Sequence, residues 1–160
     1  MAVFLRRLFG IGKLPREMRE QFDSEGIIYL AEYVAVSRRF SGKIPGFRAN
    51  GSFASYVGSL VFTSQRAVAT LSSVPKVAGR TMDVRWDDPQ QGAVNAEISS
   101  AGVSLEVDIA AIDPQFSGHL SLTYKTEIPD DVLTRLPRRN LAFEVPAEYV
   151  YRAVGVPHNP

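Results

Sequence analysis

The stretch from Ala93 to Ile109, AVNAEISSAGVSLEVDI, alternates apolar and polar residues almost without interruption. Apolar side chains occupy every second position from Val94 to Ile98, and the alternation resumes from Val103 to Ile109. A period of two is typical of a β-strand with one face in a core and the other in water. The intervening Ser-Ser-Ala-Gly segment is typical of a hairpin turn. The stretch therefore predicts two antiparallel strands.

Similar patterns on either side predict five further strands. We expect them at about residues 27–40, 56–63, 67–71, 81–87 and 117–126. Residues 41–55 are rich in Gly, Pro and Asn, and we interpret them as a long loop or an irregular hairpin. The count is then seven strands.

A helical period returns after the last of these strands. Pro129 and two acidic residues precede an apolar stripe that stops at Pro137, and Pro146 begins a last helix that ends at Gly155. We predict a mainly β fold, a seven-stranded antiparallel bent sheet or partly open barrel capped by a C-terminal helix. A helix over the open end buries the core without adding another sheet edge.

The expected organisation has three parts. Residues 1–24 form a basic, partly helical N-terminal lead, with Pro15 at the start of a short helix. Residues 25–137 form the barrel domain with its capping helix. Residues 138–160 form a C-terminal extension with a short helix.

Composition indicates one globular domain. The chain has 160 residues, of which 45% are hydrophobic and 22% are charged. It contains no cysteine, which excludes disulfides and thiol catalysis. No apolar run approaches the roughly 20 residues of a membrane-spanning helix, and Arg6 and Arg7 interrupt the apolar N-terminus before a signal-peptide core develops. We therefore expect a cytoplasmic protein, with a peripheral membrane location as an alternative.

Seven antiparallel strands closed by a C-terminal helix resemble the pleckstrin-homology-like superfamily. Residues 58–69, GSLVFTSQRAVA, are similar to a hairpin of its GRAM-like members, in which a strand ends in Thr and a polar turn carries Arg. Residues 82–87, MDVRWD, fall where these domains place the next strand. The chain also resembles uncharacterised bacterial proteins of this type. The resemblance covers about residues 25–137 and implies a binding module. The strand at residues 56–61 lacks the basic residues with which phosphoinositide-binding members hold their ligand.

The charges are unevenly distributed along the chain. Residues 1–50 carry nine basic and five acidic side chains, whereas residues 81–135 carry ten acidic and three basic ones. Such a dipole can orient a protein near a charged partner, although charges on a folded surface are often only solvated.

The basic segment around the predicted loop is the first candidate binding site. Guanidinium groups bind anions bidentately, and exposed aromatic rings insert at lipid interfaces or anchor protein interfaces. The candidate anion-binding or lipid-binding residues are Arg38, Arg39, Lys43 and Arg48, and the accompanying interface candidates are Phe40 and Phe47. The alternative is a loop whose aromatic rings fold back on the barrel.

The N-terminal segment is the second candidate. Arg6 and Arg7, together with Phe4 and Phe9, would suit an amphipathic helix at an interface. Gly10 and Gly12 weaken such a helix, and docking of the segment on the barrel or on a second subunit is the alternative.

Catalytic, metal and cofactor motifs are absent from the sequence. There is no Gly-x-Ser-x-Gly elbow, no zinc-ligand spacing, no phosphate-binding glycine loop and no dinucleotide fingerprint, and the chain has only two histidines. We therefore predict no catalytic residues, no metal site and no cofactor.

Three functional classes remain open. The favoured one is a non-enzymatic module that binds a protein partner or its own copy. The second is a peripheral binder of anionic membrane lipids. The third is a small-ligand carrier or an enzyme that uses the barrel interior. The net charge of +1 argues against nucleic acid as a partner.

Overall fold

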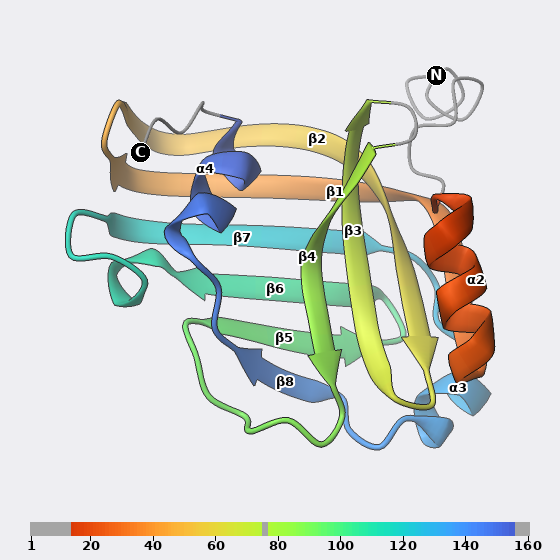
Figure 1. The fold of residues 1–160 in the computed structure, drawn as a ribbon. Helices are drawn as coiled ribbons and strands as arrows, with labels where there is room; N and C mark the ends of the chain where they lie inside the picture. The colour runs from red at the N-terminus through yellow and green to blue at the C-terminus, as the bar shows by residue number, and fades with distance from the viewer. Residues whose placement is uncertain (1–13, 75–76, 156–160) are drawn as a thin grey trace.

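A computed structural model describes residues 14–74 and 77–155 of the chain (Figure 1). Within these residues, eight antiparallel strands form one strongly bent, barrel-like sheet with the order β4-β3-β2-β1-β7-β6-β5-β8. The elements, in chain order, are α2 (Arg16–Glu25), β1 (Ile27–Ile44), β2 (Phe47–Thr63), β3 (Arg66–Val74), β4 (Val77–Arg85), β5 (Val94–Ser99), β6 (Gly102–Asp108), the 3-10 turn η1 (Ile109–Ala111), β7 (Ser117–Lys125), α3 (Asp130–Arg135), β8 (Asn140–Phe143) and α4 (Ala147–Val154).

The predicted mainly β class is confirmed, with eight strands in place of seven. The additional strand, β8, pairs antiparallel with β5, so that Leu141 lies opposite Ala96. Its four residues, of which the last three are all apolar, show no alternation that would predict a strand, and β8 forms because β5 offers it a free edge. Residues 140–154, which the sequence analysis assigned to an extension, thus share the sheet and the core with the preceding strands.

Of the two alternatives expected for residues 41–55, a loop or an irregular hairpin, the irregular hairpin is confirmed, because β1 and β2 continue through the segment. Ile44 pairs with Phe47 across a two-residue turn at Pro45 and Gly46, and Gly46 has a φ of +86°. A bulge near Gly51, with a φ of +77°, absorbs one extra residue of β2, since Asn50 and Gly51 together lie opposite Ser41. The glycines that suggested a loop therefore serve a turn and a bulge within two strands.

Helix α4 packs on the inner side of the sheet, beside β4 and over β1 and β7 (Figure 1). Its apolar face supplies five buried side chains to the main core: Tyr149, Val150, Tyr151, Ala153 and Val154. The helix begins after Pro146 and ends at Gly155, which has a left-handed φ of +76°, as the sequence predicts. Helix α3 is shorter, with only Val132 and Leu133 buried.

A buried hydroxyl network joins β7 to β3, β4 and α4. The Tyr124 hydroxyl of β7 donates to the Thr70 carbonyl of β3 at 2.9 Å and also bonds the Thr81 hydroxyl of β4. The Tyr149 hydroxyl of α4 donates to the Thr81 carbonyl at 2.9 Å. Burial raises the pKa of both tyrosines well above the usual value, although the hydrogen bond with Thr81 lowers that of Tyr124 in part. Both phenols are therefore neutral hydrogen-bonding groups.

Helix α2 packs on the opposite, outer side of the sheet. Phe22 is fully buried there in a second, smaller apolar cluster with Leu14, Val61 and Val68. The guanidinium groups of Arg66 and Arg80 lie over the Phe22 ring, with Cζ at 5.1 and 5.5 Å from its centroid.

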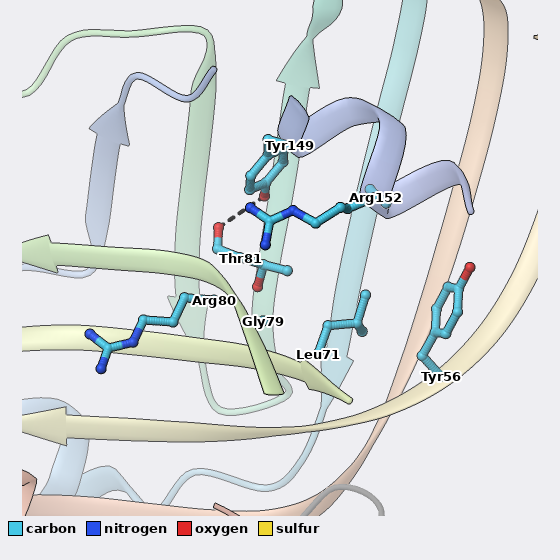
Figure 2. A pocket seen from close by; sticks show the side chains of 8 residues that line it. Tyr56, Leu71, Gly79, Arg80, Thr81, Tyr149 and Arg152 are labelled. Carbon is cyan, nitrogen blue, oxygen red and sulfur yellow. Dashed lines mark hydrogen bonds between the residues drawn. The ribbon is translucent and has the colours of Figure 1, made fainter. Parts of the chain in front are cut away.

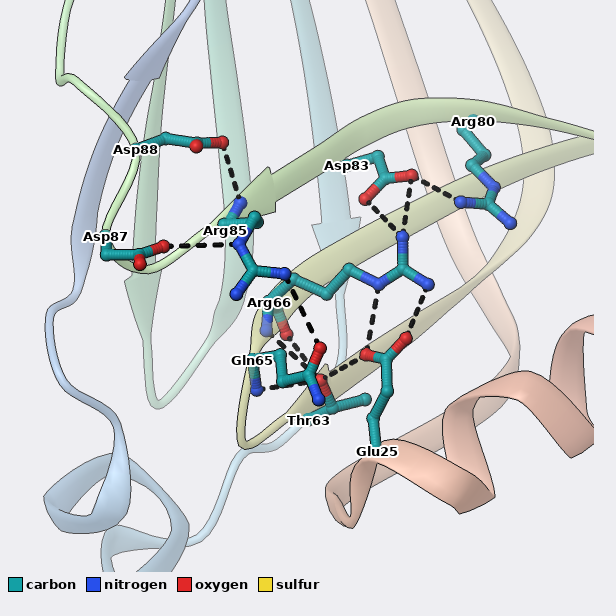
Figure 3. Close-up of polar contacts among 9 residues, drawn as sticks. All are labelled: Glu25, Thr63, Gln65, Arg66, Arg80, Asp83, Arg85, Asp87 and Asp88. Carbon is teal, nitrogen blue, oxygen red and sulfur yellow. Dashed lines mark hydrogen bonds and ion pairs between the residues drawn. The ribbon is translucent and has the colours of Figure 1, made fainter.

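An ion-pair network fixes the end of α2 to the sheet (Figure 3). Arg66 donates to both carboxylate oxygens of Glu25, at 3.1 and 2.6 Å, and to Asp83 at 3.1 Å. The side chains of Arg66 and Glu25 are only 14% and 11% exposed. Burial alone would raise the pKa of Glu25, but the hydrogen bonds from Arg66 and Thr63 and the nearby Arg66 charge outweigh it, so the pKa is lowered.

The lowered pKa of Glu25 predicts that this contact loses its stabilising effect in acid. We expect Glu25→Gln to reduce the free energy of unfolding by about 1–2 kcal/mol at neutral pH. Because the folded-state pKa lies below the unfolded one, the difference from wild type should shrink as the pH falls through the acidic range. Urea denaturation at a series of pH values measures this difference. Glu20→Gln, which removes an exposed ion pair with Arg16 on the same helix, is the control and should have little effect. Equal losses for both variants would contradict the assignment.

Gly58 of β2 provides the space that the Tyr124 network occupies. A Cβ at residue 58 would lie 2.0 Å from the Thr70 carbonyl oxygen and 3.1 Å from the Tyr124 ring. We expect Gly58→Ala to reduce the free energy of unfolding by about 2–3 kcal/mol, because the backbone of β3 would have to move. Gly79→Ala in β4 is the matched control, since its nearest contact would be an ordinary 3.4 Å. Guanidinium denaturation of both variants tests this, and an unchanged midpoint for Gly58→Ala would refute the steric argument.

Candidate functional site

The basic residues predicted near the hairpin point to opposite sides of the sheet. Arg39 and Lys43 lie on the outer side of β1, and Arg48 lies directly opposite Lys43 on β2; all three are exposed. Arg38 has the other parity and points inward, with 4% of its surface exposed. The structure therefore brings together three of the four candidates and separates Arg38 from them.

Arg38 holds the end of α4. Its Nη1 donates to the Val154 carbonyl oxygen at 3.1 Å, and its Nη2 donates to the Ser52 hydroxyl at 3.0 Å, while Nε is buried without a hydrogen-bond partner. A cation at the C-terminus of a helix is stabilised by the helix dipole and by the last carbonyl groups. This environment gives Arg38 a structural position away from the outer surface.

The aromatic candidates of the hairpin, like Arg38, are not exposed. Phe40 is 1% exposed and lies in the core, and the half-buried Phe47 stacks on it with ring centroids 5.8 Å apart. The exposed aromatic residue is Phe53, at 57% of its surface, and it is the only large hydrophobic residue so exposed in the described part of the chain. Phe53 lies opposite Arg39, whose Cζ is 5.8 Å from the centre of its ring.

Sheet register places these groups in a continuous row on the outer face. Phe53 on β2 is paired with Arg39 on β1, Arg39 with Ser121 on β7, and Ser121 with Glu106 on β6. Adjacent strands lie about 4.8 Å apart, so Arg39 and Glu106 are separated by about 10 Å across the small side chain of Ser121. We call this row and its flanking charges the outer face.

The two ends of the outer face carry opposite charge. Arg39, Lys43 and Arg48 make no ion pair with any residue that the structure describes. On the other side of β7, the exposed acids are Glu97, Glu106 and Asp108, of which Glu106 bonds His119. Residues Ser117, His119, Ser121 and Thr123 of β7 lie between the two groups.

The pair formed by Lys43 and Arg48 is unfavourable by itself. Like charges directly opposite one another on antiparallel strands destabilise the pair by a few tenths of a kcal/mol to about 1 kcal/mol. Within the described residues, no carboxylate forms an ion pair with either side chain. An anionic group from outside the molecule would remove this repulsion.

No family model matches this chain, and no curated protein or solved structure matches it either. The function is therefore inferred from the geometry of the molecule itself. In residues 14–74 and 77–155, no helix has the length and apolar composition needed to cross a membrane. The same residues contain no group of three histidine or carboxylate side chains arranged to hold a metal ion.

Some candidates lie outside the described residues. These are Arg6, Arg7, Phe4 and Phe9. Conversely, sequence analysis missed Phe53 and Glu106 as partners of Arg39. Only the register of β2, β1, β7 and β6 aligns these residues, and the bulge at Gly51 shifts the pairing that a simple hairpin count would give.

The contrast between Arg38 and Arg39 is directly testable. We expect Arg38→Met to reduce the free energy of unfolding by about 2–4 kcal/mol, because it removes the hydrogen bond to Val154 and breaks a buried polar contact. Arg39→Met should change it by less than about 0.5 kcal/mol, because the side chain is exposed and makes no ion pair. Thermal and urea denaturation of the two variants measures the difference. A large loss for Arg39→Met, or none for Arg38→Met, would contradict the assigned orientation of the strand.

Proposed function

We propose that the protein is a non-enzymatic binding module that associates with a second copy of itself through its outer face. The observation that carries this proposal is the placement of opposite charges on one exposed surface, with Arg39 and Glu106 in the same row on either side of Ser121. A surface that presents both charges in this arrangement is complementary to itself. Two-fold association of this kind is the commonest form of protein oligomer.

The register of the strands defines the two-fold symmetry of the proposed dimer. A two-fold axis that runs between two copies, parallel to β7 and above Ser121, exchanges the β1 side of the face with the β6 side. Arg39 of each copy then faces Glu106 of the other, and Phe53 faces Asn95, the next residue in the row. Each favourable charge pair occurs twice, which is the property of an isologous interface.

The side chains along β7 permit close approach. Packed sheets lie about 10 Å apart, a distance that bulky side chains at the centre of the contact would increase. Ser121 and Thr123, at the centre of the contact, are small, and the longer His119 of β7 lies toward Glu106 of β6, which it bonds. In this arrangement Lys43 is also brought near Asp108 of the second copy, which offsets the repulsion between Lys43 and Arg48.

An anionic membrane surface is the second candidate, because Phe53 is exposed beside Arg39 and could insert at the headgroup level. The acids on the same face favour the protein partner instead. Glu106 lies about 10 Å from Arg39, close to the Debye length of about 8–10 Å, so a uniformly anionic surface would be attracted by one side chain and repelled by the other. A second copy satisfies both.

A pleckstrin-homology-like assignment fits this proposal in outline. Seven consecutive antiparallel strands followed by a C-terminal helix support it, and the eighth strand between them is a departure. Many unrelated functions use one fold, so the proposed binding role rests on the outer face rather than on this resemblance.

Charge reversal with rescue tests the proposal. We expect Arg39→Glu and Glu106→Arg each to weaken self-association by about tenfold or more, because each places two like-charge pairs in the interface. The double variant Arg39→Glu/Glu106→Arg should restore it, since both contacts re-form with exchanged signs. Sedimentation velocity over a range of protein concentrations, at low and high salt, measures the association. High salt should weaken the wild-type dimer.

The control is Arg135→Glu, which reverses an exposed charge on α3 away from the outer face. It should leave the association unchanged. A wild-type protein that stays monomeric at all concentrations would refute the proposal. In that case, sedimentation with anionic and neutral vesicles, and its loss in Arg39→Glu, would favour the membrane candidate.

A further inference from the structure

A cavity lies at the rim of the sheet, between the last turn of α4 and the ends of β3 and β4 (Figure 2). It has a volume of about 230 Å³ and opens to solvent. It is separate from the outer face, because α4 packs on the inner side of the sheet. A cavity of this size exceeds the ~150 Å³ of an apolar cavity that holds benzene.

The walls of the cavity are mainly apolar. The ring of Tyr56, the side chain of Leu71 and the methyl group of Ala153 line it, together with the ring of Tyr149. The Tyr149 hydroxyl is already engaged, since it donates to the Thr81 carbonyl oxygen. Burial raises the pKa of Tyr149, so that its phenol adds no negative charge to the cavity.

Arg152 supplies the charge. It projects from α4 across the cavity toward Thr81 and Gly79, as Figure 2 shows. A Cβ at residue 79 would lie 3.4 Å from its Nη1, so the absence of a side chain on Gly79 leaves the guanidinium next to the β4 backbone. The residue is exposed, and an anion can therefore reach it from solvent.

No described residue neutralises Arg152 by an ion pair. The described lining of the cavity contains no carboxylate, and the guanidinium of Arg152 forms no hydrogen bond with a described residue. Arg80, the other arginine of the lining, points away from the cavity in Figure 2 and pairs instead with Asp83. The cavity therefore combines apolar walls with a single available guanidinium.

We propose that this cavity binds a small carboxylate with an apolar body, such as an aryl or short alkyl carboxylate. A guanidinium pairs bidentately with a carboxylate, and the apolar walls would cover the remainder of the molecule. One available positive charge matches a monoanion. The apolar lining distinguishes such a ligand from inorganic phosphate, which would gain nothing from the rings of Tyr56 and Tyr149.

Titration of the full chain with benzoate and hexanoate, followed by backbone amide NMR shifts, tests the proposal. We expect shifts confined to residues around α4, β4 and Tyr56, with a dissociation constant of about a millimolar or below. Arg152→Met keeps the apolar stem and removes the charge, and it should weaken benzoate binding by about tenfold or more. Gly79→Val fills the cavity and should abolish binding while leaving the fold intact, as its own NMR spectrum will show.

Three controls make the outcome decisive. Arg135→Met removes an exposed arginine elsewhere and should leave benzoate binding unchanged. Benzamide, which has no charge, should bind more weakly than benzoate to wild type, and equally to wild type and Arg152→Met. Inorganic phosphate should not reproduce the benzoate shifts. The proposal is overturned if benzoate shifts no residue of the cavity, if phosphate acts equally, or if Gly79→Val binds benzoate normally. Self-association is measured with different variants, so either proposal can fail alone.

Discussion

The hydroxyl group of Tyr124 connects parts of the sheet that are far apart in strand order. Tyr124 lies on β7, yet its phenol bonds Thr70 on β3 and Thr81 on β4, across the interior that the bent sheet encloses. A buried phenol without partners would destabilise the fold, so the sheet must bend until those partners reach it. Gly58 makes the bend possible because any side chain there would meet the Thr70 carbonyl. Helix α4 then docks on Thr81 through Tyr149.

Contacts between strands that are distant in the sequence also explain which parts of the fold can be predicted from the sequence and which cannot. The alternation from Ala93 to Ile109 predicted β5 and β6 because side-chain parity is a local property of a strand. Strand β8 was not predicted, and the loop and hairpin alternatives for residues 41–55 could not be distinguished, because both features depend on a neighbouring strand. β8 has four residues and forms on the free edge of β5, and the glycines of the hairpin are explained only by its turn and bulge.

The candidate site also combines features that the local sequence predicts with features that depend on neighbouring strands. The sequence identified the basic character of the β1–β2 hairpin, and Arg39, Lys43 and Arg48 are indeed exposed together. It could not separate Arg38 from Arg39, because the alternation of β1 is interrupted by inward-facing polar groups such as Arg38 itself. Nor could it pair Arg39 with Phe53 and Glu106, since these three residues come from β1, β2 and β6 and meet only through the register of four strands.

The two neighbouring arginines show how one strand can contribute to stability and also to the proposed association. Arg38 is buried against the end of α4, where water and solution ions cannot compete for its hydrogen bonds. Arg39, one residue later, points to solvent and has no ion-pair partner among the described residues. A change at Arg38 therefore affects folding before it can affect binding, whereas a change at Arg39 alters the charge of the outer face and leaves the core in place. Because the strand period is two, a ligand of the outer face would contact odd-numbered positions of β1 between Val34 and Ile44, whereas the even-numbered positions of this part of the strand face the core and α4.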